Sequence, residues 1–259
     1  MKVVLADDKV SLSYRTVGRG PHTIFLIHGW LLSGAWMEEL TRQLDTQTLR
    51  VIVPDLRGSG ASGKPETGYC IEQFAHDILT IAEAEQVASF VVVGHSMGAQ
   101  VAQWLAATYP QRILGCCLIC PVPASGVTLP EDLANTFRNA HSSEVQRSIF
   151  ESSTNKLPAE TISAMIRDAS QTIPAAVREG FDAWSRGAGA ENLKNICAPT
   201  LVISTDDGTL PRDFLLSAVV GKIKNARLAY LPGPGHFAHI ERPRETAALI
   251  EAFLAGLLR

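Results

Sequence analysis

One stretch, FVVVGHSMG at residues 90–98, limits the folds open to this chain more than any other. Its β-branched run predicts a strand buried on both faces, and the apolar and small residues at 100–107 predict a helix directly after it. Because no linker separates the two, the chain must turn sharply, with Ser96 at the tip of the turn. Gly94 and Gly98 lack the side chains that would collide as strand and helix close on each other. The sequence therefore predicts a serine hydroxyl exposed at the carboxyl edge of a sheet.

Buried-strand patterns alternate with helical patterns over most of the chain. A buried strand is a short run of β-branched and other apolar residues, whereas a helix repeats its apolar residues about every 3.6 positions. We expect strands at residues 10–15, 22–27, 51–55, 90–93, 113–120, 199–203 and 228–231. We expect helices at residues 37–44, 71–85, 100–107 and 244–258, and another that begins at Arg212. This alternation requires crossover connections and predicts an α/β protein with a mostly parallel sheet.

The pattern changes in the second half of the chain. Strand-like runs are absent from about residue 127 to 189, and short helical patterns replace them at residues 131–140, 143–151, 158–169 and 175–186. A helical insertion at the sheet edge where Ser96 lies would cap that edge. The predicted organisation is a core of residues 1–126 and 190–259 with a helical cap at 127–189. Five large apolar residues of the cap either line a pocket or pack its helices together: Phe137, Phe150, Met165, Phe181 and Trp184.

The segment Gly94-His95-Ser96-Met97-Gly98 resembles the Gly-x-Ser-x-Gly nucleophile elbow of the α/β-hydrolase fold. The resemblance implies an eight-stranded, mostly parallel sheet flanked by helices, with the cap inserted after the sixth strand. Earlier in the chain, His28-Gly29-Trp30-Leu31-Leu32 looks like the same segment in bacterial aryl esterases and in their relatives, the cofactor-free haloperoxidases or perhydrolases. The haloperoxidases usually carry proline where this chain has Leu31. That difference favours ester hydrolysis.

A serine nucleophile needs a partner that takes its proton during attack and returns it to the leaving group, and histidine suits both steps. The histidine needs a carboxylate that fixes its tautomer and stabilises its protonated form. In the family that the chain resembles, these residues follow in the order serine, acid, histidine. Ser96, Asp207 and His236 match that order, and His236 lies on a Gly/Pro-rich loop directly after the last expected strand. Asp206 remains an alternative to Asp207, because counting forward from Ile203 leaves the choice open.

The tetrahedral intermediate of acyl transfer needs N–H donors aimed at its oxyanion. The resemblance implies that these donors are the backbone N–H groups of Met97, directly after the serine, and of Trp30, directly after the His-Gly pair. Because the main chain donates, the side chains of Trp30 and Met97 are free to shape the acyl pocket. No cofactor and no metal ion is expected, and the neighbouring pair His236 and His239 lacks the further ligands of a metal site.

The glycines after the strand at 51–55 fit two phosphate-binding patterns. Gly58-x-Gly60-x-x-Gly63 matches a dinucleotide fingerprint, and residues 58–64 match most of a P-loop. Pro65 stands where a P-loop needs a hydroxyl for magnesium, and the next helical pattern begins too late to direct its dipole at a phosphate. The hydrolase family carries a similar Asp-x-x-Gly-x-Gly-x-Ser turn at this place. We therefore interpret the loop as scaffold.

Composition excludes several other kinds of function. The net charge is near -3 and Lys and Arg form no cluster, which argues against a nucleic-acid or anionic-membrane surface. No apolar run is long enough to span a bilayer, and acidic residues near the N-terminus do not fit a signal peptide, so we expect a cytoplasmic protein.

Three of the five cysteines lie in one apolar run and are interpreted as buried thiols of a reduced compartment. On a strand, Cys117 and Cys120 would point to opposite faces.

The sequence thus predicts a serine hydrolase that cleaves carboxylic esters of small to medium apolar molecules through an acyl-enzyme. Enol-lactone hydrolysis and cofactor-free perhydrolase or haloperoxidase chemistry stay open, because they use the same triad. A non-catalytic ligand-binding protein of the same fold is the alternative from a different class, and the intact triad argues against it. The expected partner is a small ester-type molecule, and the sequence leaves the oligomeric state open, a homo-oligomer included.

Overall fold

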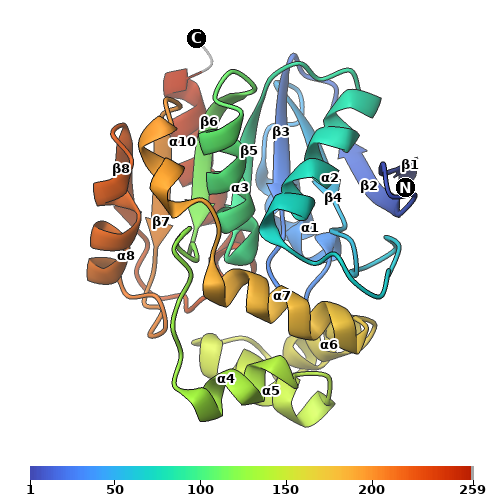
Figure 1. Ribbon diagram of the computed structural model, residues 1–259. Helices are drawn as coiled ribbons and strands as arrows, with labels where there is room; N and C mark the ends of the chain where they lie inside the picture. The colour runs from blue at the N-terminus through green and yellow to red at the C-terminus, as the bar shows by residue number, and fades with distance from the viewer. Residues whose placement is uncertain (258–259) are drawn as a thin grey trace.

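A single eight-stranded sheet forms the centre of the molecule in a computed structural model that describes residues 1–257 (Figure 1). The strands are β1 (Lys2–Leu5), β2 (Ser11–Val17), β3 (His22–Ile27), β4 (Leu49–Pro54), β5 (Phe90–His95), β6 (Ile113–Ile119), β7 (Thr200–Ser204) and β8 (Ala226–Tyr230). Their order across the sheet is β1-β2-β4-β3-β5-β6-β7-β8. β2 is antiparallel to both β1 and β4, and all other neighbours are parallel. The expected eight-stranded, mostly parallel sheet is confirmed.

Helices cover both faces of this sheet (Figure 1). Outside the insert described below they are α1 (Glu38–Gln43), α2 (Ile71–Ala84), α3 (Met97–Thr108), α8 (Arg212–Ala218), α9 (Ala238–Glu241) and α10 (Pro243–Leu257). Val92 of β5 packs in the apolar cluster beneath α2 and α3, whereas Val91 and Val93 pack in the cluster beneath α1 and α10. β5 is therefore buried on both faces, as its β-branched run predicts. Within residues 1–257, no helix is both long and apolar enough to cross a lipid bilayer.

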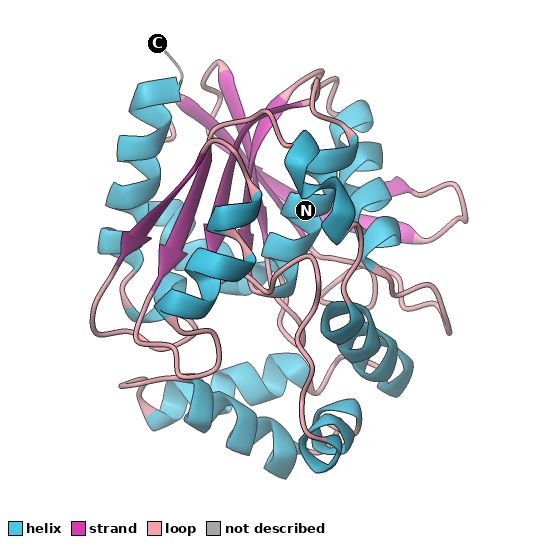
Figure 2. Cartoon of the chain, turned by 60° about the vertical axis from the view of Figure 1, so that its left-hand side comes forward, coloured by secondary structure: helices cyan, strands magenta, loops and turns pink. Residues whose placement is uncertain are grey.

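Four helices inserted after β6 form the cap. They are α4 (Glu131–Arg138), α5 (Ser143–Ser153), α6 (Ala159–Ala169) and α7 (Pro174–Arg186). Figure 2 shows them gathered at one end of the molecule, beyond the carboxyl ends of the parallel strands. Their apolar cluster includes Phe150 and Met165. The expected helical insertion is confirmed, while the division into a core of residues 1–126 and 190–259 and a cap domain of 127–189 stays a prediction.

The sequence patterns miss some short elements. β1 is an edge strand with mostly exposed residues, so it lacks the apolar alternation that marks a half-buried strand. The helix expected at 37–44 is preceded by a 3₁₀ turn, at whose start the Ser33 hydroxyl accepts the Ala35 N–H. The three 3₁₀ turns of the described residues, η1 (Gly34–Met37), η2 (Ala190–Asn195) and η3 (Val220–Lys222), were not expected from the sequence. The expected end of the last helix, Leu258, lies outside the described residues.

The three cysteines of the apolar run are buried free thiols, as expected. The expectation that Cys117 and Cys120 point to opposite faces is wrong, since both belong to the apolar cluster beneath α1 and α10. β6 ends at Ile119, and Cys120 adopts a left-handed backbone conformation with φ 42°. The alternation of a strand stops at such a residue. Cys120 thus turns back toward the face that already holds Cys117.

A buried arginine holds the loop after β4 against α2. The side chain of Arg57 is 1% exposed and donates two hydrogen bonds of 2.7 Å to Asp77, which is 2% exposed. It also donates at 2.7 Å to Asp8, whose side chain is 46% exposed. Burial raises the pKa of Asp77 despite the opposing effect of Arg57. The folded chain therefore depends on Arg57 to keep the Asp77 carboxylate charged inside the core.

We expect Arg57→Ala to lower the free energy of unfolding by about 3–5 kcal/mol at neutral pH, because it leaves the charge of Asp77 buried without a partner. Removing Arg57 raises the folded-state pKa of Asp77 further above its unfolded value, so the folded state binds a proton more readily as the pH falls. The loss should therefore be smaller near pH 5 than near pH 7. Urea denaturation at both pH values measures it.

Asp8→Ala is the matched control, since it removes the exposed partner of the same guanidinium and should cost less than about 1 kcal/mol. Equal losses for Asp8→Ala and Arg57→Ala, or a loss that grows on acidification, would contradict this account of the buried pair.

Candidate active site

Ser96 lies at the turn between β5 and α3 with a strained backbone of φ 54° and ψ -118°. Such values are costly for a residue with a side chain and persist only where packing imposes them. A Cβ on Gly94 would come within 2.2 Å of the Gly98 carbonyl oxygen, and a Cβ on Gly98 within 2.4 Å of the Ile27 carbonyl oxygen. Both glycines of the elbow are therefore needed for the close approach of strand and helix.

The imidazole of His236 is fixed by a buried carboxylate. Its Nδ1 lies 2.6 Å from Oδ2 of Asp207, whose side chain is 2% exposed. The other carboxylate oxygen accepts the backbone N–H of Thr209 at 2.8 Å. Burial acts to raise the pKa of Asp207, but the interaction with His236 and the hydrogen bonds from the backbone hold that pKa below its ordinary value. An ionised Asp207 can only accept, so Nδ1 carries the proton and Nε2 is left free to accept one.

The structure separates the two candidate acids. Asp206 lies at the surface, where it accepts the hydroxyl of Tyr230 and, at 2.8 Å, the backbone N–H of Gly233. These bonds lower the pKa of Asp206 without any contact with His236. Asp207 alone of the pair reaches the histidine. The chain bends at Asp206, just after β7, so that the Asp206 side chain lies at the surface and the Asp207 side chain lies buried beside His236.

Ser96 and His236 line the same cavity beneath the cap. In the part of the chain that the structure describes, no hydrogen bond joins the Ser96 hydroxyl to His236, although apo sites often tighten only with substrate bound. The cavity volume is about 80 Å³. Its other lining residues are Trp30, Leu31, His95, Val122, Val127, Phe137, Ile149, Phe150, Ser153, Trp184, Thr209, Leu210 and Phe237. No Lys, Arg, Asp or Glu is among them, so the cavity offers no side chain that would pair with a charged group.

The two expected oxyanion donors belong to segments that meet at Ser96. Met97 is the first residue of α3, so its N–H has no acceptor within the helix. Trp30 follows Gly29 in the loop after β3, and a Cβ on Gly29 would lie 3.1 Å from the Ser96 Cβ. The loop therefore passes directly beside the serine. The structure brings Ser96, Met97 and Trp30 together, and the role of the two N–H groups as oxyanion donors stays a prediction.

The Trp30 side chain lies in an aromatic cluster between core and cap. Its ring stacks on Phe137 with centroids 5.7 Å apart and meets Phe181 and Trp184 at 6.2 and 6.0 Å. Its Nε1 donates to the Val177 carbonyl oxygen of α7 at 3.0 Å. Of the cap residues singled out in the sequence, Phe137, Phe150 and Trp184 line the cavity. Met165 and Phe181 pack within the apolar clusters.

Two groups that hold the backbone of His236 have no signal in the sequence. The carbonyl oxygen of Ser153, at the end of α5, accepts the backbone N–H of His236 at 2.7 Å. The ring of His95 bonds the His236 carbonyl oxygen through Nε2 at 2.9 Å. Burial is the main cause that lowers the pKa of His95, and it also lowers that of nearby His239 to about 3. Both rings are therefore neutral. His95 hydrogen-bonds the His236 loop, and the His239 ring packs against His95 with centroids 4.3 Å apart.

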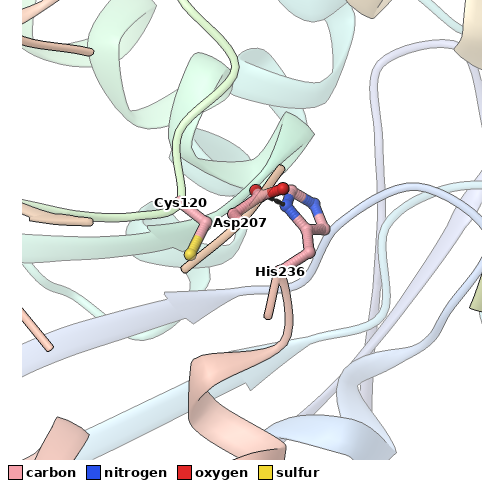
Figure 3. A group of neighbouring side chains, drawn as sticks. All are labelled: Cys120, Asp207 and His236. Atoms are coloured by element: carbon pink, nitrogen blue, oxygen red, sulfur yellow. Dashed lines mark hydrogen bonds and ion pairs between the residues drawn. The ribbon is translucent and has the colours of Figure 1, made fainter. Parts of the chain in front are cut away.

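Cys120, Asp207 and His236 form the one group of three His, Cys, Asp or Glu residues in the described chain with potential ligand atoms close together, within 4.8 Å of one another (Figure 3). Burial raises the pKa of the Cys120 thiol, and the Asp207 charge adds to the effect. The thiol lies 3.4 Å from the hydroxyl of Thr205. A cysteine that ligates zinc must be a thiolate, and the ligand atoms of a tetrahedral zinc site lie roughly 3.5 Å apart. The group therefore suits a proton-sharing Asp–His pair beside a neutral thiol better than a metal centre.

The glycine-rich loop after β4 is filled by a carboxylate of the chain itself. Asp55 accepts the backbone N–H groups of Gly34 and Ala61, each at 2.9 Å. A Cβ on Gly60 would lie 2.4 Å from the Asp55 carboxylate. A phosphate at this place would meet that negative charge. The contacts support the interpretation of this loop as scaffold.

Comparison with known proteins agrees with this architecture. A non-heme haloperoxidase from Rhodococcus erythropolis is 29% identical over 257 residues, covering 91% of this chain and 93% of its own. A bifunctional esterase/perhydrolase from Acinetobacter calcoaceticus is 26% identical with the same coverage. Among solved structures, Est816, described as an N-acyl homoserine lactone degrading enzyme, is 28% identical with a TM-score of 0.85, covering 96% of this chain and 99% of its own.

The family model for the alpha/beta hydrolase fold matches residues 22–243, which includes the elbow, the cap and the His236 loop. The likeness to haloperoxidases and esterases that the His28-Gly29-Trp30 segment indicates is confirmed by these relatives. Because the family model matches most of the sequence, and because the chain has the eight-stranded sheet and a helical insert after β6, this chain belongs to the alpha/beta hydrolase fold family.

Proposed function

We propose that this protein is a serine hydrolase that cleaves carboxylic esters of small, uncharged molecules through an acyl-enzyme. The observation that carries the proposal is the 2.6 Å contact between Asp207 and His236 at the cavity that Ser96 also lines. A serine on a strained turn, a histidine of fixed tautomer and a buried carboxylate are the parts that acyl transfer requires. Each side chain comes from a different loop at the carboxyl edge of the sheet.

The proposed reaction runs in two halves. Ser96 Oγ attacks the ester carbonyl carbon while Nε2 of His236 takes the hydroxyl proton, and Asp207 stabilises the resulting imidazolium. The N–H groups of Met97 and Trp30 stabilise the oxyanion. The intermediate collapses, His236 returns the proton to the leaving alkoxide, and an alcohol departs from the acyl-enzyme. A water molecule then attacks in the same way and releases the carboxylic acid and free Ser96.

The cavity supports a substrate class. About 80 Å³ of space with an apolar, largely aromatic lining leaves room for a short acyl or a compact aryl group and offers no charged partner for an ionic one. Ser153 and Thr209 are the hydroxyl-bearing residues of the lining besides Ser96. We therefore expect acetyl and butyryl esters to be better substrates than long-chain or charged esters.

The second candidate is perhydrolase chemistry on the same triad, which the names of the Rhodococcus and Acinetobacter relatives favour. Leu31 argues against it. Its φ is 70°, whereas a proline ring holds φ near -65°, so proline could not take this backbone conformation. The loop beside Trp30 therefore differs in shape from one that contains the proline usual in haloperoxidases. Lactone hydrolysis remains a variant of the main proposal, because it breaks the same acyl–oxygen bond.

The proposal predicts hydrolysis of p-nitrophenyl acetate and butyrate that exceeds peroxide-dependent bromination in the same preparation. Ser96→Ala should reduce kcat by at least about 10³-fold, since it removes the nucleophile. Cys120→Ala is the matched control, because the thiol lies beside Asp207 but takes no part in the steps above. Bromination that dominates by orders of magnitude would overturn ester hydrolysis in favour of the second candidate. A folded wild-type protein that turns over neither substrate would support a ligand-binding role.

The choice of acid is tested by a pair of neighbouring variants. Asp207→Asn should lower kcat by about 10³–10⁴-fold, because an amide can leave His236 in the wrong tautomer and cannot stabilise the imidazolium. Asp206→Asn should leave kcat within about threefold, since Asp206 bonds Tyr230 and Gly233 instead. Steady-state kinetics on p-nitrophenyl butyrate measures both. A larger loss in Asp206→Asn would reverse the assignment.

A further inference from the structure

A carboxylate of the cap holds the loop that follows β3. Asp168, near the end of α6, accepts three hydrogen bonds from that loop. Ser33 donates its backbone N–H at 2.8 Å and its hydroxyl at 2.9 Å, and Trp36 donates its Nε1 at 3.0 Å. Both carboxylate oxygens are used, although the partners lie more than 130 residues apart in the chain. None of the proposed catalytic steps uses Asp168.

The same loop carries Trp30, the proposed oxyanion donor, and it touches the cap at two further places. The Trp30 indole donates to the Val177 carbonyl oxygen of α7 at 3.0 Å. The side chains of Leu31 and Leu32 are 2% exposed and belong to the apolar cluster of the cap. Residues 30–33 therefore lie against the cap, with polar contacts at both ends and apolar contacts between them.

The core holds both ends of this loop by hydrogen bonds. The backbone carbonyl oxygen of Gly29 lies 2.8 Å from Nδ1 of His28, whose Nε2 accepts the Leu56 N–H. At the other end, the Gly34 N–H donates to Asp55. Between them Leu31 has φ 70°, a left-handed conformation that costs a leucine energy and persists only where surrounding contacts impose it. At this point Leu31 packs in the apolar cluster that contains Met165 and Val177 of the cap.

We infer that Asp168 is a positioning residue for ester hydrolysis. By holding Ser33 and Trp36, it fixes the loop conformation that directs the Trp30 N–H at the oxyanion. The inference rests on the proposed function, because it assigns Trp30 the role given there. An oxyanion donor acts mainly in the transition state, so its displacement lowers kcat and leaves KM nearly unchanged. Displacement of a reacting group by about 1 Å can cost about 100-fold in rate.

The test compares Asp168→Ala with Asp168→Asn. Alanine removes every acceptor. Asparagine can place its carbonyl oxygen where Oδ2 accepts from Ser33 and Trp36, while its amide donates to the Ser33 hydroxyl. We expect Asp168→Ala to lower kcat on p-nitrophenyl butyrate by about 10–100-fold with KM within about threefold, and Asp168→Asn to stay within about threefold in both. Titration with a fluorophosphonate counts the active sites, so that kcat refers to folded enzyme only.

Asp182→Ala is the matched control. Asp182 is also a cap carboxylate, but its ion pairs are with Arg138 at 2.9 Å and Arg186 at 3.6 Å, both within the cap. The substitution Asp182→Ala should loosen the cap without releasing the loop after β3, so kcat per titrated site should not change. If Asp168→Ala proves too unstable to purify, Trp36→Phe removes one donor alone and should give a smaller loss of kcat in a folded protein. An unchanged kcat in Trp36→Phe would then count against the inference.

Three results would overturn the inference. The first is a kcat per titrated site in Asp168→Ala equal to that of the wild type. The second is a loss of kcat in Asp182→Ala equal to the loss in Asp168→Ala. The third is a loss of kcat in Asp168→Asn as large as in Asp168→Ala. Failure of the proposed function looks different, since the wild type itself would then hydrolyse no ester. In that case amide hydrogen exchange over residues 29–37 tests only whether Asp168 holds the loop after β3 in place. Faster exchange in Asp168→Ala than in wild type and Asp182→Ala supports it, and equal exchange in all three overturns it.

Discussion

The left-handed backbone of Ser96 is the constraint on which the rest of the site depends. Such a conformation costs on the order of 1–3 kcal/mol, and here it is imposed by β5, which is buried between β3 and β6, and by α3 packed directly behind it. The buried valines of β5 supply the packing that offsets the cost. Gly94 and Gly98 make the close approach possible. The serine therefore cannot relax into an ordinary turn without separating the strand from the helix.

Every other functional group reaches this turn from a loop at the same edge of the sheet. Asp207 and His236 follow β7 and β8, and Trp30 follows β3. The cap closes the edge and holds two of these loops, through the Ser153 carbonyl oxygen at His236 and through Asp168 at the loop that carries Trp30. The cap thus has two effects in one arrangement. It covers a small apolar cavity, and it restrains the backbone of groups to which the proposed mechanism gives a role.

Much of the fold follows from local patterns, because the buried strands are β-branched runs and the cap helices have clear apolar periods. Ser96 and His236 can be recognised in the sequence because each lies in a glycine-containing turn directly after a predicted strand. The sequence favours Asp207 as the acid but leaves Asp206 open, because no local pattern shows which of the two neighbouring side chains faces His236. Asp168, His95 and the Ser153 carbonyl oxygen leave no local signal. Their contacts join segments more than 80 residues apart, which only the folded chain brings together.

In the proposed mechanism, Ser96 is a nucleophile activated by His236. Mass spectrometry after reaction with a fluorophosphonate tests this role, because the reagent phosphonylates an activated serine and leaves ordinary hydroxyls unmodified. We expect one adduct per chain, mapped to the peptide that contains Ser96, and its loss when His236 is replaced by alanine. A folded protein that stays unmodified, or an adduct on another residue, would contradict this role.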